Sequence, residues 1–407
     1  MSTLSHSRRP RSAARFAILL ISALALIVTG FSAGSAQAAG YVHSCATSAK
    51  RGQATCFALR RTDISEPSAL KADAIAPNAT PSGLSPASLQ SAYALPSSTN
   101  GSGQTVGIVD AYNDPNAEAD LAVYRTQYGL PACTTANGCF KKVSQTGSTT
   151  SLPANNSGWA GEIALDVEMV SAICPNCKIL LVEATSASIA NLSTAENEAV
   201  TLGAKFVSNS WGATESSSYK SYDTSFNHSG VAITASSGDD GYGAAWPATV
   251  PTLTAVGGTS LTSSTTATRG WTETAWSGAG SGCSSVETKP SYQSSVTTGC
   301  SKRAEADVSA VANPNTGVAV YQTYGASGWT VYGGTSVASP IIASVYALAG
   351  PVASTVIGPS LAYAHPSSLF DVTSGSNGSC STKVLCTAGT GWDGPTGLGT
   401  PNGIGAF

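Results

Sequence analysis

The chain has 407 residues, of which only 11% are charged, and its formal net charge is −3 at pH 7. Nucleic-acid-binding proteins carry a strongly basic surface, so this composition argues against a nucleic-acid partner. Few carboxylates are present to take up protons in acid, and a fold with few such groups is expected to tolerate low pH.

The first 38 residues have the three parts of a secretory signal peptide. Four arginines within residues 8–15 precede an apolar core at 16–31, and small residues at 36–38 form a cleavage site. Removing them takes away four arginines and no acidic residue, so the net charge changes from −3 to −7. No later run is long and apolar enough to span a bilayer. We therefore expect a secreted, extracellular monomer without a membrane partner; the export route stays open.

All ten cysteines follow the predicted signal and fall into close neighbours. In an exported chain, this even set indicates disulfides that close short loops, although sequence alone does not prove connectivity. The expected pairs are Cys45–Cys56, Cys133–Cys139, Cys174–Cys177, Cys283–Cys300 and Cys380–Cys386. The alternative is a metal site at Cys174 and Cys177, but no second Cys-x-x-Cys or nearby histidine completes it.

Residues 39–82 are rich in Ser, Pro, Ala and Thr, show little periodicity, and are interpreted as a short propeptide or linker. From residue 83 to residue 407, apolar strands and helices alternate. Strands are expected at 105–111, 178–183, 206–210 and 231–236, and helices at 116–128, 158–173 and 189–202. This alternation predicts one α/β domain with a mostly parallel sheet covered by helices on both faces.

Three of the predicted strands end in polar sequences, at residues 110–112, 208–212 and 236–241. In parallel sheets the chemistry lies just beyond the carboxyl ends of the strands. We therefore expect a cleft at these three ends.

The helix predicted at 158–173 carries two acids, Glu162 and Asp166, that stand four residues apart. This spacing places them on one face, which apolar residues continue in the next turn. We interpret them as a buried pair that shares a proton and can act as a general base. The alternative is a solvated pair of helix acids. Glu168 points elsewhere and is expected to be solvated.

Two glycines precede Ser336, and an apolar stretch at 337–349 follows it. The glycines allow a sharp turn, and Ser336 is expected to begin a buried helix. There its hydroxyl lies at the positive end of the helix, and its N–H is free to bind an anion. A nucleophilic serine with half an oxyanion hole has these properties. A serine N-cap is the alternative.

A nucleophilic serine needs a base, and the histidines after the signal, His43, His228 and His365, have no recognisable catalytic context. Asp110 follows the first strand as an Asp/His/Ser arrangement would require, but we favour a strand-end cap there. Without a histidine, a carboxylate must take the proton. Glu162, with Asp166 behind it, is the candidate.

At this point the chain resembles the sedolisins, serine-carboxyl peptidases with a subtilisin-like three-layer fold and a Ser-Glu-Asp triad. The resemblance runs from about residue 84 to the C-terminus. Residues 334–340 are similar to the nucleophile motif, and residues 162–166 to the Glu-x-x-x-Asp helix. Asp239, within residues 237–241, matches the aspartate of the oxyanion hole.

The strand end at 208–212 is similar to the family's substrate-binding strand, and carries Ser210, Trp211 and Gly212. Trp211 is expected to offer a flat apolar wall for a substrate side chain, or else to lie in the core. Gly212 leaves its backbone open to pair with an extended peptide.

The resemblance implies an acid-acting endopeptidase that hydrolyses protein or peptide substrates through an acyl-enzyme. Ser336 would be the nucleophile, Glu162 the base, and Asp166 the residue that positions Glu162. The N–H of Ser336 and a protonated Asp239 would stabilise the oxyanion, because a neutral carboxylic acid can donate a hydrogen bond.

Residues 370–373 and 388–393 resemble the family's calcium site, in which carboxylates and backbone carbonyls bind Ca²⁺ from glycine-rich turns. The implied ligands are Asp371, Val372, Gly389, Gly391 and Asp393. The alternative is two Asp-capped turns. The Cys380–Cys386 loop lies between the two halves and could perturb the site.

Two features depart from the family pattern. The segment between the signal and the domain is much shorter than the usual prodomain, and Asp240 stands where a small polar residue is more common. The short segment leaves open the alternative that the chain is a catalytically weak or inactive binding protein with a peptidase fold. A glycosidase using Glu162 and Asp166 is a second rival, but acids on adjacent turns of one helix fit poorly across a sugar bond.

Overall fold

The computed structural model of the protein describes residues 40–46, 51–64 and 80–407. The signal peptide predicted at 1–38 lies outside these residues. Within the described ranges, no helix has both the length and the apolar character needed to cross a membrane.

The centre of the domain is an eight-stranded sheet whose neighbouring strands are parallel, except for one antiparallel edge strand. Its middle strands are short apolar runs buried on both faces, as parallel strands usually are. In spatial order they are β12 (Trp271–Ala275), β11 (Thr254–Ser263), β9 (Ala232–Ser236), β7 (Phe206–Asn209), β4 (Thr105–Ala111), β6 (Lys178–Ala184) and β5 (Phe140–Ser144), and β15 (Val308–Val311) also pairs with β11.

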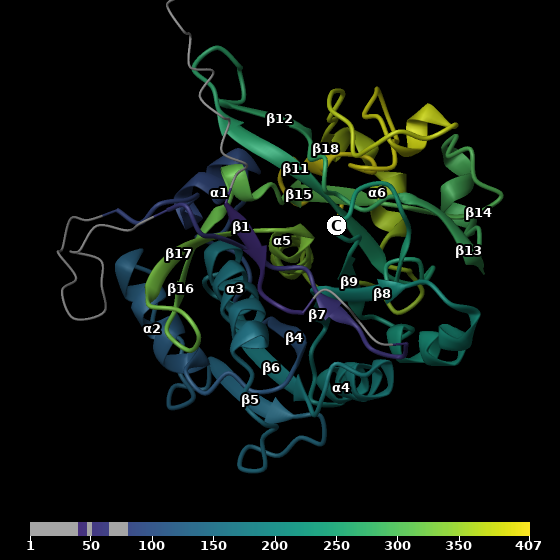
Figure 1. Ribbon diagram of the computed structural model, residues 1–407. Helices are drawn as coiled ribbons and strands as arrows, with labels where there is room; N and C mark the ends of the chain where they lie inside the picture. Colours follow the sequence, from purple (N-terminus) through teal and green to yellow (C-terminus); the bar gives the residue numbers. More distant parts are fainter. Residues whose placement is uncertain (1–39, 47–50, 65–79) are drawn as a thin grey trace, which may run out of the picture. The chain divides into compact units, whose positions relative to one another are not determined.

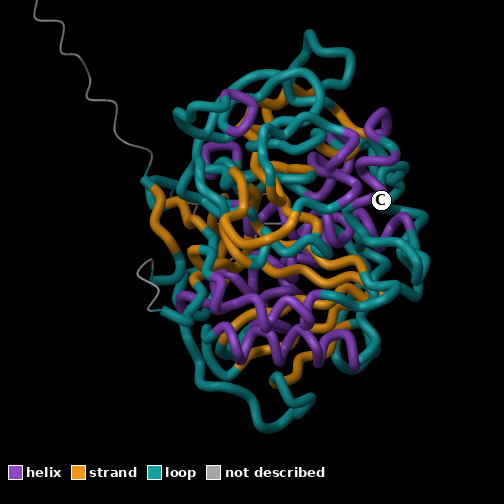
Figure 2. Tube along the Cα trace, turned by 90° about the vertical axis from the view of Figure 1, so that its right-hand side faces the viewer, coloured by secondary structure: helices purple, strands orange, loops and turns teal. Residues whose placement is uncertain are grey.

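Helices cover both faces of this sheet (Figures 1 and 2). The helices are α1 (Pro86–Ala92), α2 (Ala117–Gln127), α3 (Ser157–Ile173), α4 (Ile189–Thr201), α5 (Thr335–Ala349) and α6 (Ser360–Ala364). Alternate residues of β4 belong to different cores: Val106 and Ile108 pack with α3 and α5, whereas Val109 and Ala111 pack with α4. The predicted three-layer α/β architecture is therefore confirmed.

Each strand and helix predicted between residues 105 and 236 is present, with its ends within one residue of the prediction. The prediction that Glu168 is solvated was wrong, because α3 is buried on every side from Trp159 to Ile173. Glu168 Oε2 accepts a hydrogen bond of 2.9 Å from the N–H of Tyr321. Tyr321 lies in β16 (Val318–Gln322), a strand that packs against α3.

Residues 40–64, predicted as part of a propeptide or linker, contain three strands where the structure describes them. β1 (Tyr41–His43) and β3 (Leu59–Arg61) extend a sheet in the order β1-β3-β17-β16, in which β17 is Gly328–Gly333. β2 (Thr55–Cys56) pairs with β8 (Trp211–Thr214), which also pairs with β10 (Ala245–Trp246). The remaining short sheets are β13 (Gly282–Thr288) with β14 (Lys302–Glu305), and β18 (Leu369–Phe370) with β19 (Thr400–Pro401).

All five predicted disulfides are present, and none of the described cysteines is free. Cys174 and Cys177 are bonded to each other at the end of α3, which removes the alternative of a metal site there. Each bond closes a loop of 3 to 17 residues. The prediction that neighbouring cysteines pair with each other is therefore confirmed.

Candidate active site

Ser336 lies in the first turn of α5, directly after the turn that joins β17 to the helix. Gly334 makes this turn with φ of +96°, a conformation that L side chains rarely adopt. Pro340 lacks an N–H, so the carbonyl of Ser336 is left without its usual helical partner. The hydroxyl of Ser210 donates to that carbonyl instead, at 3.4 Å.

Glu162 and Asp166 lie on one face of α3, as predicted, and both are fully buried. The Oγ of Ser336 is 2.9 Å from Glu162 Oε2 and 3.2 Å from the carbonyl oxygen of Ser210. Asp166 Oδ1 accepts a hydrogen bond of 2.8 Å from the hydroxyl of Ser210. None of the described residues offers a hydrogen-bond partner to Glu162 Oε1 or Asp166 Oδ2. The structure thus brings serine and carboxylates together, and the solvated pair is excluded.

Burial raises the pKa values of Glu162 and Asp166 well above their ordinary values, because the charged forms lose their hydration. The negative charge of Asp110 adds to this rise in both cases. Asp110 was expected to cap the end of its strand, which is wrong. Its carboxyl is buried in β4, and no described residue hydrogen-bonds to either oxygen. Three carboxyls in one buried cluster cannot all be ionised at neutral pH.

Asp239 lies on the other side of Ser336, in the loop after β9. Its Oδ1 accepts hydrogen bonds of 2.8 Å from both the N–H and the hydroxyl of Thr335. Its Oδ2 has no hydrogen-bond partner among the described residues. Burial raises the pKa of Asp239 to about 8, and the neighbouring Asp240 contributes to the rise while Thr335 opposes it. At neutral pH Asp239 is therefore mostly protonated, and its free oxygen Oδ2 is the one that can donate.

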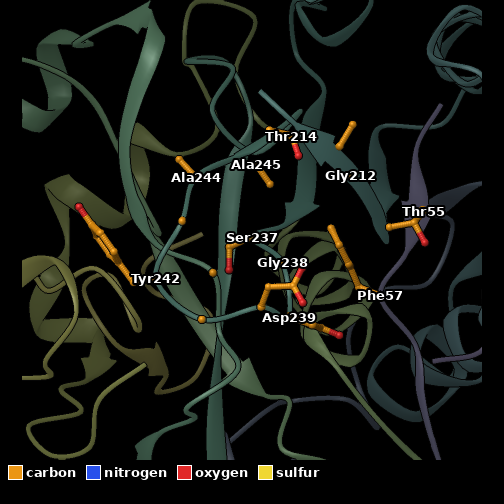
Figure 3. Close-up of a pocket in the computed structure, with 15 residues that line it drawn as sticks. Thr55, Phe57, Gly212, Thr214, Ser237, Gly238, Asp239, Tyr242, Ala244 and Ala245 are labelled. Atoms are coloured by element: carbon orange, nitrogen blue, oxygen red, sulfur yellow. The ribbon is translucent and has the colours of Figure 1, made fainter. Parts of the chain in front are cut away.

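A cavity of about 410 Å³ opens beside Asp239 (Figure 3). Its walls are β8, the loop after β9 and the N-terminal segment, and it lies at the carboxyl ends of the strands, as predicted. The lining residues include Thr55, Phe57, Gly212, Gly238 and Ala245. This volume lies at the lower end of the range for pockets that bind small ligands, which is about 300–1,000 Å³.

The two expectations for Trp211 are resolved in favour of the core. Its side chain is fully buried against Trp246 and Phe226, and its Nε1–H donates to the carbonyl of Val109 at 2.8 Å. The ring therefore forms no wall of the cavity, and that prediction was wrong. The backbone of Trp211 and Gly212 does pair with another strand, through Cys56 and Thr55 of β2.

None of the hydrogen-bond partners of Ser336 Oγ is a histidine among the residues that the structure describes. His228 Nε2 lies 2.9 Å from the carbonyl oxygen of Ser225, in another part of the domain. The Asp/His/Ser arrangement considered from the sequence is therefore not formed.

In the region of the predicted calcium site, two carboxylates bind the same glycine-rich loop. Asp371 Oδ2 accepts from the N–H of Gly391 at 2.9 Å, and Asp393 Oδ2 accepts from the N–H of Gly389 at 3.1 Å. Burial raises the pKa of Asp393 to about 7, and the charge of Asp371 adds to the rise. Hard oxygens and two nearby negative charges fit a calcium ion. Within the described ranges no group of three or more His, Cys, Asp or Glu side chains is arranged to hold a metal ion, so backbone oxygens would have to complete the site.

The sequence analysis did not predict three features of the site. These are the hydrogen bond from Ser210 to Asp166, the hydrogen bonds from Thr335 to Asp239, and the place of Asp110 in the acidic cluster. Ser210 and Thr335 lie within the motifs at 208–212 and 334–340, but small hydroxyl residues are abundant in this chain and give no signal of their own. The sequence did give a signal for Asp110, which lies within an apolar strand run. An acid there is expected to be buried, and a buried carboxyl destabilises the fold unless it is paired or protonated.

Comparison with known proteins agrees with this fold. The model of the subtilase family matches residues 101–353, which is more than half of the chain. This match places the chain among the subtilases.

Two curated relatives indicate the group within the subtilases to which the chain belongs. The chain is 31% identical over 363 residues to kumamolisin from Bacillus sp. (strain MN-32), covering 80% of this chain and 63% of kumamolisin. It is 30% identical over 364 residues to sedolisin from Pseudomonas sp. (strain 101), covering 79% of this chain and 60% of sedolisin. The solved structure of Pseudomonas sedolisin, a serine-carboxyl proteinase complexed with two molecules of pseudo-iodotyrostatin, matches with a TM-score of 0.68 and 28% identity, over 79% of this chain and 96% of that one. The chain belongs to the sedolisin family, which has the subtilisin-like fold.

Proposed function

We propose that this protein is a secreted serine-carboxyl endopeptidase that hydrolyses peptide bonds at acidic pH. The observation that carries the proposal is the 2.9 Å contact between Ser336 Oγ and Glu162 Oε2 beside a cleft. A serine hydroxyl within hydrogen-bond reach of a buried carboxylate is an activated nucleophile. The curated relatives support the reaction class, and the chain spans 60% to 63% of their length.

In the proposed reaction, Ser336 Oγ attacks the carbonyl carbon of the substrate while Glu162 Oε2 takes the hydroxyl proton. Asp166 positions Glu162. A proton shared between Glu162 Oε1 and Asp166 Oδ2 would give a partner to two buried oxygens that otherwise lack one. The pair then carries a single negative charge, which burial tolerates better than two.

The oxyanion of the tetrahedral intermediate would be stabilised from two sides. The N–H of Ser336 lies in the first turn of α5, where backbone donors are not used by the helix. Asp239 presents Oδ2, whose pKa near 8 keeps it protonated in acid. Substrate would enter as an extended strand and pair with the backbone of β8 at Gly212.

Secretion is part of this proposal, and the five disulfides support it. Such bonds persist outside the cell and are rare in reducing compartments. The substrates we propose are therefore extracellular proteins or peptides.

The test of the function is covalent labelling together with proteolysis. The purified protein should react with a fluorophosphonate or a peptide aldehyde at Ser336 and should hydrolyse casein. Ser336→Ala should lose labelling and lower hydrolysis by about a thousandfold or more, because the nucleophile is absent. Release of reducing sugar from a glycan, with casein left intact, would favour the glycosidase. Binding of peptide without turnover or labelling would favour the inactive binding protein.

Calcium is the proposed metal, held by the carboxylates of Asp371 and Asp393 with backbone oxygens of Val372, Gly389 and Gly391. It would act on stability, by neutralising two adjacent acids in the native state. Chelation with EDTA should lower the melting temperature by several degrees, because a ligand that binds only the native state stabilises it.

Readdition of Ca²⁺ should restore that temperature, whereas Mg²⁺ at the same concentration should not, because it demands a tighter octahedral shell. Asp393→Ala should melt low with or without EDTA. A melting curve that EDTA leaves unchanged, with no calcium found by elemental analysis of the purified protein, would remove this metal from the proposal.

A further inference from the structure

A second pair of buried acids lies on the central sheet, on the face that α3 covers. The strands β4, β6 and β5 are neighbours in this sheet (Figure 1). Asp110 of β4 stands directly opposite Glu183 of β6. Each follows, by two positions, a residue of the core under α3, Ile108 or Leu181, and residues two apart in a strand point to the same face. Glu183 is fully buried, and the proposed reaction does not use it.

Glu183 presents one carboxyl oxygen to donors and keeps the other free. Oε1 accepts a hydrogen bond of 3.0 Å from the N–H of Asp114 and lies 3.8 Å from Nζ of Lys142. The ammonium group of Lys142 donates to Asn113 Oδ1 at 2.8 Å and to the carbonyl of Asp114 at 2.5 Å. Oε2 of Glu183 has no hydrogen-bond partner among the described residues. A proton on Glu183 is therefore carried by Oε2, because Oε1 is already an acceptor.

Both acids of this strand pair are neutral at acidic pH. Burial raises the pKa of Glu183 to about 8, although Lys142 and the N–H of Asp114 oppose the rise. Burial also raises the pKa of Asp110 well above its ordinary value, and the charge of Glu183 adds to that rise. The titratable side chains around the two acids come from α3, the loop after β4, α2 and β5, and they are Glu162, Asp166, Asp114, Asp120 and Lys142.

The free oxygens of these acids continue to the catalytic pair, Glu162 and Asp166. Five carboxyl oxygens of the four residues lack a hydrogen-bond partner among the described residues: Glu183 Oε2, both oxygens of Asp110, Glu162 Oε1 and Asp166 Oδ2. Buried polar atoms are nearly always paired, so protons must lie between these carboxyls. A protonated Glu183 can donate to one oxygen of Asp110, and a protonated Asp110 can donate from its other oxygen to the catalytic pair.

We propose that Glu183 is a positioning residue: in its protonated form it donates to Asp110, and Asp110 in turn donates to the catalytic pair. This inference rests on the proposed function. A hydrogen bond donated to the pair favours its single negative charge over its doubly protonated form. Hydrogen bonds in a chain strengthen one another, so Glu183 makes Asp110 a better donor. Glu162 therefore remains a base at a lower pH than its burial alone would allow.

The test is the acid limb of the pH profile of kcat/KM, measured with a chromogenic peptide. Glu183→Met keeps the length of the side chain but cannot donate, so the catalytic pair should take up its second proton at higher pH. The midpoint of the acid limb should then move toward neutral by about half a pH unit or more. A loss of stability alone lowers the amount of active protein and leaves this midpoint in place.

Glu183→Gln should restore the native acid limb. The amide has the shape of the protonated acid, its N–H can donate to Asp110, and its oxygen can accept from the N–H of Asp114. If Glu183→Met does not fold, Glu183→Gln still decides, because a role that depended on a charged Glu183 would be lost in it.

Glu196→Met is the matched control. Glu196 is also fully buried, and its two carboxyl oxygens lack partners among the described residues. It lies on α4, which covers the opposite face of the sheet, so it does not face Asp110. The acid limb of this variant should stay in place.

The outcomes separate this proposal from the proposed function. An acid limb that stays in place in Glu183→Met would overturn the role of Glu183 and leave the peptidase function standing. So would an acid limb that moves as far in Glu183→Gln or in Glu196→Met. If the native protein shows no hydrolysis that depends on Ser336, both proposals fail.

Discussion

Replacing Glu162 by glutamine should lower kcat/KM on peptide substrates by about a thousandfold at every pH. A positioned general base contributes about a hundredfold to ten-thousandfold to such a reaction. The amide oxygen of glutamine can still accept hydrogen bonds from Ser336 Oγ and the N–H of Ala58, which Glu162 Oε2 contacts in the structure, but it cannot take up the hydroxyl proton. The structure offers no substitute base on Ser336 Oγ, whose other described contact is the carbonyl oxygen of Ser210.

Glu168→Gln is the matched control for this variant. Glu168 is a second buried acid on α3, and it accepts from the N–H of Tyr321 instead of contacting Ser336. The glutamine can accept the same hydrogen bond, so activity should stay within a few-fold of the native value. The comparison is made by steady-state hydrolysis of a chromogenic peptide, with melting curves for both variants. If Glu162→Gln kept native kcat/KM, or if Glu168→Gln lost as much, Glu162 would not be the base.

The sheet and its helices were predictable from the sequence because each element carries a strong local pattern. The run from residue 105 to 111 is apolar on both faces, and the helix at 189–201 alternates apolar and polar residues at helical spacing. Burial on a parallel sheet demands these patterns, so they identify the elements without knowledge of their neighbours.

The segment at 40–64 could not be predicted in this way. Its strands are two or three residues long, and they form only because β8 and β17 offer unpaired edges to them. Such short strands carry too few residues for a period to be seen, and their partners lie far away in the sequence. The interpretation of 39–82 as a short propeptide or linker therefore missed the part of the segment that lies in the site.

The misplaced side chains in the site have a related cause. The sequence shows that Glu168 lies in a helix and Trp211 at a strand end, but not what covers their other sides. Glu168 is buried because β16 lies against it, and Trp211 because Trp246 and Phe226 do. The pair Glu162 and Asp166 could be assigned, because the lack of a catalytic histidine gave a chemical reason to look for a carboxylate that contacts Ser336.

The pH dependence of activity should be bell-shaped, with its maximum below about pH 6. Activity requires that the Glu162–Asp166 pair carry one negative charge, so it is lost as pH falls and the pair takes up its second proton. It also requires that Asp239 keep its proton, so it is lost as pH rises through the pKa of Asp239. That pKa is about 8, because burial disfavours the charged form of Asp239. Entry of water beside this carboxyl would lower its pKa and move the alkaline limb toward acid.

Asp239→Asn separates the two limbs of this profile. An amide can still donate to the oxyanion but does not titrate, so partial activity should remain and the alkaline limb should disappear, while the acid limb stays in place. His228→Ala is the control for a histidine-based mechanism and should leave the profile unchanged, because His228 contacts the carbonyl of Ser225 and not Ser336. Both profiles are measured as kcat/KM on the purified mature protein. A neutral or alkaline maximum that vanishes in His228→Ala would overturn the carboxylate mechanism, since a histidine base loses function below its ordinary pKa of about 6.5.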